Sequence, residues 1–268
     1  MATHFINDRR QLWLGYLLII FGVNGWTLHV QAATTKPVWV DNVEIIGQSA
    51  DGISAFLGIP FARAPVGNLR WQPPQTDVHL AGPFWANSFA PACPQGDSNT
   101  RWYQAVANRL HGSASDIPIH AAPQIAENCL ALNIWAPIDI NSNNPVPVLV
   151  WIHGGGHRDG YSYEPNYQGQ ALAKQMHVMV VSIGYRLNVF GFMPPKLDNH
   201  QTLPLALQDQ IAALEWIHKN IKMFGGDANN VTIAGESAGA ADVETLLLEP
   251  KVAYLFKRAI SQSGDLFC

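Results

Sequence analysis

Charge is scarce in this sequence, and positive charge is not in excess. Only 13% of the 268 residues are charged, and the formal net charge is -4. This balance gives no electrostatic reason to expect a nucleic acid or an anionic membrane as a partner. Hydrophobic residues reach 48%, which excludes a disordered chain and indicates a core-rich globular protein. The sequence has no internal repeat, and its length suits one large domain or two small ones.

A long apolar run is also missing. The run Leu12–Val23, preceded by Arg9 and Arg10, has twelve residues. It is too short to span a bilayer comfortably, but it matches the apolar region of a secretory signal, and Val30–Ala32 offers small residues for cleavage. We therefore expect residues 1–32 to be a signal peptide, the mature protein to be secreted or periplasmic, and no stable membrane insertion after cleavage. The alternative is an uncleaved N-terminal anchor.

Cysteine is rare, with three residues: Cys93, Cys129 and Cys268. In an oxidising compartment two of them can pair and one remains unpaired. Cys93 and Cys129 flank a polar stretch with Gly and Ser, so a bridge between them would close a long surface loop. The alternative is two buried free thiols. An unpaired cysteine at the last position suggests that part of the protein is missing.

The sequence pattern predicts an α/β fold. Val38–Ile46 and Ile53–Leu57 suggest a small antiparallel hairpin, and the Pro- and Gly-rich segment Phe61–Gln75 an ordered loop. From Pro147 onward, continuous apolar runs typical of buried strands alternate with helical periodicity. That order indicates parallel strands joined by crossover helices. The expected strands are 146–153, 178–185, 231–234 and 258–263, and the expected helices are 171–175, 205–224 and 238–248.

Ser237 lies in the motif Gly-Glu-Ser-Ala-Gly between a predicted strand and a predicted helix. In this context the motif indicates a nucleophile elbow, a sharp turn with a strained serine backbone. Glycines on either side, Gly235 and Gly239, remove Cβ atoms that would collide with the neighbouring strand and helix. The hydroxyl is then expected near the N-terminus of the following helix, where developing negative charge is favoured. The alternative is an ordinary turn in which the serine caps the helix.

A glycine run, His153–His157 (HGGGH), follows the first buried strand. It would let the backbone N–H groups of Gly155 and Gly156 approach a substrate, and the N–H of Ala238 would complete an oxyanion hole. His153 and His157 also have the spacing of metal ligands on a helix, but the intervening glycines argue against a helix. A phosphate loop is a weaker alternative, because no G-K-[ST] follows.

From about residue 37 to its end the chain resembles the N-terminal half of a type-B carboxylesterase, in the cholinesterase-like branch of the α/β-hydrolases. The resemblance is carried by FLGIPFARAPVGNLRWQPP, ENCLALNIWAP, VLVWIHGGGHRDG, GYRLNVFGF, LQDQIAALEWIHKNIKMFGGDANNVTIAGESAGA and FKRAISQSG. It implies that residues 33–268 are the N-terminal portion of one α/β-hydrolase domain, with a mostly parallel sheet and an N-terminal antiparallel hairpin. Small-molecule esters are the implied substrates, and no metal or organic cofactor is required.

The resemblance also implies roles for individual residues. Ser237 is the nucleophile, and Gly155, Gly156 and Ala238 form the oxyanion hole. Cys93 and Cys129 correspond to the first disulfide of the family, and two internal ion pairs are implied, Arg70 with Glu127 and Arg186 with Asp209. Physical reasoning agrees, because charges buried among apolar runs must be paired. The alternative is that these four charges lie on the surface.

The chain departs from the family pattern at several positions. Gly184 stands where the family usually has Asn, and Asn188 where it usually has Gly. His157 stands where an aromatic residue is more usual. Trp102 lies between Cys93 and Cys129, but at the wrong offset for the choline-stacking tryptophan, so it predicts no choline specificity.

No histidine follows Ser237, although a serine nucleophile needs a general base. All ten histidines precede it, and the only carboxylates after it are Asp242, Glu244, Glu249 and Asp265. The resemblance places the triad acid and histidine in a C-terminal half. We therefore expect a truncated chain, inactive by itself, of an esterase that works through an acyl-enzyme. The alternatives are a non-catalytic cholinesterase-like binding or adhesion protein, an inactive fragment, or a secreted lipase.

Overall fold

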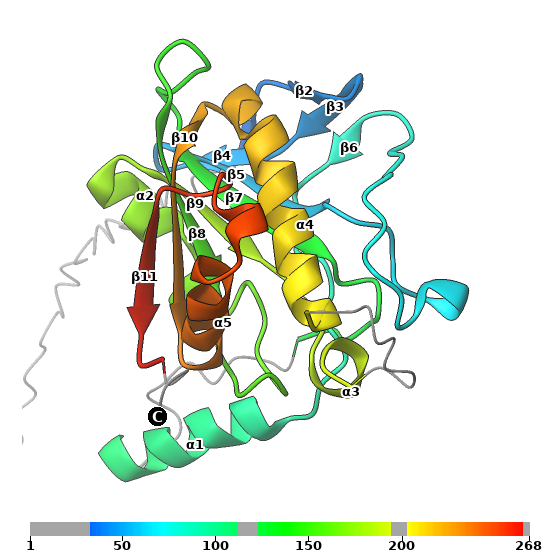
Figure 1. The fold of residues 1–268 in the computed structure, drawn as a ribbon. Helices are drawn as coiled ribbons and strands as arrows, with labels where there is room; N and C mark the ends of the chain where they lie inside the picture. Colours follow the sequence, from blue (N-terminus) through cyan, green and yellow to red (C-terminus); the bar gives the residue numbers. More distant parts are fainter. Residues whose placement is uncertain (1–32, 112–122, 194–202, 265–268) are drawn as a thin grey trace, which may run out of the picture. The chain divides into compact units, whose positions relative to one another are not determined.

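The computed structural model describes residues 33–111, 123–193 and 203–264 (Figure 1). The expected signal peptide, residues 1–32, and Cys268 lie outside the described residues.

An eight-stranded mixed sheet forms the centre of the described fold, in the order β1-β4-β5-β7-β9-β8-β10-β11. The neighbours β9, β8, β10 and β11 run parallel, as the strand–helix alternation predicts, and the other neighbours run antiparallel. The antiparallel part of the large sheet is therefore larger than the single N-terminal hairpin that the sequence predicted. It includes β7, a strand buried along its whole length that the sequence analysis did not identify. The strands are β1 (Ala33–Thr34), β4 (Gln48–Ala50), β5 (Ile53–Pro60), β7 (Ala131–Pro137), β8 (Val146–Ile152), β9 (Met179–Ile183), β10 (Gly226–Glu236) and β11 (Arg258–Gln262).

The single hairpin expected between Val38 and Leu57 is two hairpins in two sheets. β2 (Val38–Val40) pairs with β3 (Val43–Ile46) in a three-stranded sheet completed by β6 (Phe84–Trp85), whereas β4 pairs with β5 in the large sheet. Asp41 and Asn42 both have positive φ, and so do Asp51 and Gly52, as type I′ turns require. Two tight turns replace the one broad turn expected from Gly47–Gly52.

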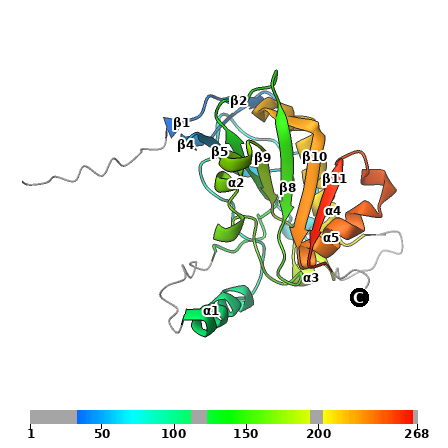
Figure 2. The ribbon, with the colours of Figure 1, turned by 90° about the vertical axis from the view of Figure 1, so that its left-hand side faces the viewer.

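Helices cover both faces of the large sheet. α2 (Gln170–Met176) lies on one face, and α4 (Leu205–Asn220) and α5 (Ala238–Leu247) lie on the other (Figure 2). The expected helix over 205–224 continues from α4 as a 3-10 turn, Ile221–Phe224, and ends at Gly225, whose φ of 89° a glycine adopts without strain. The short helices are η1 (Gly67–Leu69), η3 (Pro165–Tyr167), α3 (Asn188–Gly191) and η5 (Pro250–Val252).

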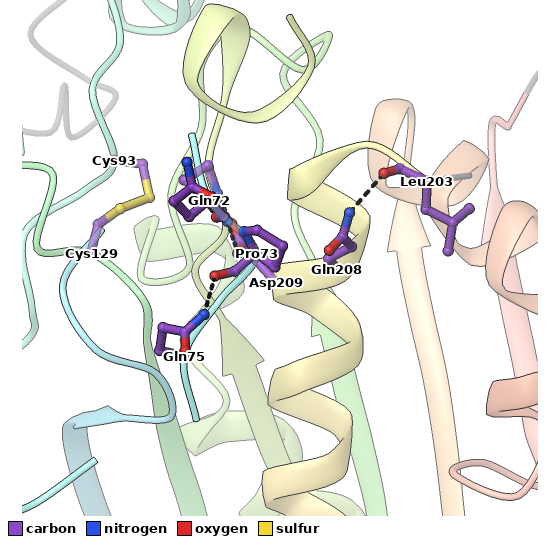
Figure 3. A network of polar contacts seen from close by, with 9 residues as sticks. Gln72, Pro73, Gln75, Cys93, Cys129, Leu203, Gln208 and Asp209 are labelled. Carbon is purple, nitrogen blue, oxygen red and sulfur yellow. Dashed lines mark hydrogen bonds and ion pairs between the residues drawn. A yellow bond between two sulfur atoms is a disulfide. The ribbon is translucent and has the colours of Figure 1, made fainter. Parts of the chain in front are cut away.

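The segment between Cys93 and Cys129 is not only a loop. It contains α1 (Ser98–His111), which lies beyond the carboxyl ends of the parallel strands (Figure 1). The structure joins Cys93 to Cys129 by a disulfide at the base of this segment (Figure 3). The bridge fixes a helix-bearing segment at the sheet edge where α/β folds bind ligands.

Candidate active site

Ser237 occupies the sharp turn between β10 and α5. Its φ of 53° and ψ of -122° match the first central residue of a type II′ turn, which normally requires glycine. Its N–H donates to the carbonyl oxygen of Gln262 in β11 at 2.9 Å. Its side chain makes no capping hydrogen bond to α5. A serine that merely caps the helix does not explain this strained backbone.

The glycines of the elbow are required by close packing. A Cβ on Gly235 would lie 2.3 Å from the carbonyl oxygen of Gly239. One on Gly239 would lie 2.2 Å from the carbonyl oxygen of Ile152, at the end of β8. The two collisions predicted from the motif, with helix and neighbouring strand, are the ones that the geometry contains.

The glycine run lies directly against the elbow. Gly235 pairs with Ile152 in the parallel sheet, so the residues after each strand emerge side by side. A Cβ on Gly154 would lie 2.6 Å from the carbonyl oxygen of Glu236 and 3.2 Å from the Cβ of Ser237. The structure thus brings His153–Gly156 and Ser237 together.

Several N–H groups beside Ser237 are free to bind an anion. Within the described ranges no acceptor takes a hydrogen bond from the N–H of Gly155 or Gly156. Ala238 is the first residue of α5, and the first N–H groups of a helix have no acceptor within it. The helix dipole adds partial positive charge at the same place. These groups can therefore stabilise an oxyanion.

A cavity of about 650 Å³ opens in front of Ser237. One wall is the glycine loop, and another is α1, which contributes Trp102 and Tyr103. The sequence-based prediction had placed this segment in a polar surface loop, although α1 carries amphipathic helical periodicity, so α1 was not expected at the site. The lining residues are Ser98, Asn99, Trp102, Tyr103, Gly154–Gly156, Arg158, Asp159, Glu164, Asn166, Tyr167, Glu236 and Ser237.

Polar contacts fasten α1 to this cavity, and Glu164 is their centre. Asn99 Nδ2 and the Tyr103 hydroxyl donate to its carboxylate at 2.8 and 3.0 Å. The Ser98 hydroxyl donates to Asp159. Glu164 is 3% exposed, and burial raises the pKa of its carboxyl group. No motif in the sequence indicated this residue.

His153 is buried and held inside its own loop. Its ring stacks on Tyr185 with centroids 4.4 Å apart, and its Nδ1 lies 2.9 Å from the carbonyl oxygen of Gly154. Burial lowers the pKa of His153 to about 4. Among the described contacts His153 makes no hydrogen bond with Ser237.

The titration of His153 predicts acid sensitivity of the fold. Because its folded pKa lies below the usual 6.5, the unfolded chain binds the proton more readily, and stability is lost as pH falls from 6.5 to about 4. The expected loss is about 3 kcal/mol of unfolding free energy. Urea unfolding between pH 4 and 7 should show a shallower pH dependence for His153→Phe. His177→Gln, a change at an exposed histidine, should keep the wild-type slope; equal slopes in all three proteins would contradict the prediction.

His157 extends from the glycine loop to α5. Its Nε2 lies 3.0 Å from Oδ1 of Asp242 and 3.2 Å from the carbonyl oxygen of Ala238. Its φ of 59° is left-handed, so it and His153 do not lie on one helix as a metal pair would require. Among the described residues, no group of three or more His, Cys, Asp and Glu side chains could hold a metal ion.

The structure accommodates both residues that depart from the family pattern, Gly184 and Asn188. Asn188 has a φ of 45°, which asparagine tolerates better than most residues, and its Nδ2 donates to the carbonyl oxygen of Pro94 at 2.7 Å. A Cβ on Gly184 would lie 2.7 Å from the carbonyl oxygen of Cys129. Both residues therefore fit the chain next to the disulfide.

The structure forms both implied ion pairs, in different environments. Arg186 and Asp209 have side chains 3% and 0% exposed and share two hydrogen bonds of 2.6 and 2.7 Å. Arg186 also donates to the carbonyl oxygen of Gln72 at 2.8 Å. Arg70 and Glu127 make two bonds of 2.6 Å, but their side chains are 39% and 23% exposed. Surface placement is excluded for the first pair only.

Comparison with known proteins adds a family assignment to this geometry. A family model described as "Carboxylesterase family" matches residues 38–268. Carboxylesterase 1F of Mus musculus is 41% identical over 226 residues, covering 84% of this chain and 38% of that protein. Acetylcholinesterase 1 of Caenorhabditis briggsae is 36% identical over 224 residues, covering 83% of this chain and 34% of that protein.

Solved structures of esterases are similar to this chain, in agreement with the family assignment. A thermophilic PNB esterase superposes with a TM-score of 0.74 at 36% identity, covering 85% of this chain and 44% of that one. A carboxylesterase from Geobacillus stearothermophilus gives 0.67 at 38% identity, covering 81% and 41%. The chain thus spans less than half the length of each of these relatives. In the part of the chain that the structure describes, no helix is long and apolar enough to cross a membrane.

Proposed function

The chain belongs to the carboxylesterase family, and from this premise we propose that it hydrolyses small-molecule carboxylic esters through an acyl-enzyme on Ser237. The observation that carries the proposal is the strained Ser237, whose hydroxyl caps no helix, beside the free N–H groups of the glycine loop. Such strain is retained where the surrounding structure enforces it, and it concentrates at functional sites.

The proposed reaction has two steps. The Ser237 oxygen attacks the ester carbonyl carbon, and the N–H groups of Gly155, Gly156 and Ala238 stabilise the oxyanion. The alcohol then leaves with a proton, and water attacks the acyl-enzyme to release the acid and restore the serine. Neither step uses a metal ion or an organic cofactor.

A general base must take the proton of Ser237, and none of the described residues hydrogen-bonds its hydroxyl. We assign the base and its orienting acid to residues outside 1–268. The protein is placed outside the cytosol in the same proposal, because a structural disulfide such as Cys93–Cys129 persists in oxidising compartments.

A non-catalytic binding protein of the same fold is the competing proposal. Such a protein has no need for a partly exposed serine in a conformation that normally requires glycine. The retained Ser237, its flanking glycines and the cavity before it favour the esterase.

Covalent labelling tests the proposal. The protein encoded by the gene when it is read past the codon for Cys268 should react with a fluorophosphonate at Ser237, as located by peptide mass, and Ser237→Ala should abolish the label. Residues 1–268 alone should label only at the rate of free serine. Labelling at another residue would contradict the role of Ser237. Rapid labelling and ester hydrolysis by residues 1–268 alone would place the base within them.

A further inference from the structure

One side chain connects the two parts of the candidate oxyanion hole. His157 directly follows Gly154–Gly156, which carry the loop N–H groups. Its Nε2 reaches α5, where it lies 3.2 Å from the carbonyl oxygen of Ala238 and 3.0 Å from Asp242. Ala238 carries the remaining donor N–H. The His157 ring therefore links the glycine loop to the start of α5, and His157 and Ala238 lie 81 residues apart in the sequence.

The acceptor end of this contact is buried and fixed. The Asp242 side chain is 4% exposed, and its Oδ2 accepts a hydrogen bond of 2.7 Å from Nε2 of Gln210 in α4. A carboxylate held in this way within a protein interior favours a cationic partner over a neutral one. His157 is the partner that the structure provides.

The His157 end is also fixed. Its ring stacks on Phe192 with centroids 4.3 Å apart, and its carbonyl oxygen accepts a hydrogen bond of 2.7 Å from the N–H of Asn188. Backbone and ring are therefore both constrained, so a change at Nε2 is transmitted to the loop and to α5.

We propose that His157 is a positioning residue, and that its ion pair with Asp242 clasps the glycine loop to α5 and so sets the spacing of the oxyanion donors. The proposal rests on the ester hydrolysis proposed above. It assigns a role to the unusual histidine after the glycine run, and it pairs that histidine with an aspartate on the nucleophile helix.

We call the ion pair between His157 and Asp242 the clasp, and its strength depends on pH. Burial acts to lower the pKa of His157, but its hydrogen bond to Asp242 and the charge of Asp242 outweigh burial and raise it above 6.5. The other titratable groups coupled to this pair are His153, buried and neutral, and Tyr185, whose pKa burial raises well above 10. Phe192 and Gln210 do not titrate. The donors should therefore be most firmly held below the pKa of His157 and less so above it.

Nuclear magnetic resonance on the isotopically labelled chain tests this directly. The ring of His157 should titrate above pH 6.5, and the amide signals of Gly155, Gly156 and Ala238 should follow the same midpoint. Asp242→Asn preserves the shape and removes the charge, so it should move all four midpoints to lower pH by about 1. Asp139→Asn, which removes an exposed carboxylate 3.9 Å from His177, is the matched control and should leave them unchanged.

Two results would overturn the clasp: amides that do not titrate with His157, or a midpoint that Asp242→Asn leaves in place. A variant that unfolds would be recognised by general loss of amide dispersion, and His157→Gln then provides the second test, because it should remove the titration of the three amides. The readout does not involve ester hydrolysis. Coincident midpoints together with failed labelling of Ser237 would support the clasp and refute the esterase. Labelling of Ser237 together with midpoints that do not coincide would support the esterase and refute the clasp.

Discussion

Ser237→Ala is expected to lower kcat/KM for an acetate ester at least about 10,000-fold in the protein that carries the general base. The hydroxyl oxygen is the only atom removed, and only with that atom can an acyl-enzyme form. The binding cavity and the oxyanion donors remain, so a small residual rate and an unchanged KM are expected. Hydrolysis of p-nitrophenyl acetate measures the effect, and a variant within tenfold of wild type would refute the acyl-enzyme mechanism.

Relieving the backbone strain at Ser237 should increase the stability of the protein, although loss of the serine abolishes catalysis. Ser237 holds a φ of 53° and a ψ of -122°, which glycine adopts freely. Ser237→Gly should therefore raise the unfolding free energy by about 1 kcal/mol, the relief of strain less the greater entropy of the unfolded glycine. Ser237→Ala keeps the strain and is the matched control, with stability close to wild type. Equal stability of all three proteins in urea would show that the turn is not strained.

The elbow and its neighbouring loop could be predicted from the sequence because each depends on local requirements. The geometry of the turn is determined by residues close together in the sequence: a strand, a serine flanked by glycines and a helix. Gly235 and Gly239 stand where only glycine fits. The parallel strands β8, β9 and β10 were equally predictable, because their buried parts are apolar runs. β7 was not identified, because the polar Asn133 interrupts its apolar run and Pro137 ends it.

Contacts between distant segments could not be read in this way. His157 was noted as unusual and Asp242 as one of few carboxylates after Ser237, yet their pairing depends on a left-handed backbone at His157 that points the ring to α5. α1 was hidden for a related reason. Its polar contacts with Glu164 join residues more than 60 positions apart, and no local sequence pattern indicates such a pairing.

Arg186→Met is expected to lower the unfolding free energy by about 3–5 kcal/mol, because it leaves Asp209 as an uncompensated buried charge. Asp209 is 0% exposed, and of its hydrogen bonds with described residues only the one from the backbone N–H of residue 186, 3.1 Å from Oδ2, would remain without the arginine side chain. The double variant Arg186→Met with Asp209→Leu removes both charges and should recover most of the loss. Arg70→Met breaks the more exposed pair with Glu127 and should cost much less. Urea unfolding at pH 7 distinguishes these cases.

The pH dependence of the Arg186→Met protein gives the sharpest form of this prediction. Burial raises the pKa of Asp209 above its usual 3.8, and Arg186 opposes that rise, so removing the arginine should raise the pKa further. A carboxyl group whose folded pKa is raised is stabilised in its protonated form, and stability is lost as pH rises from the unfolded value through the folded one. The deficit of the single variant should therefore shrink as pH falls from 7 toward 4, whereas the double variant should show no such change. A deficit independent of pH would mean that the loss comes from packing around the Arg186 side chain and not from the buried charge of Asp209.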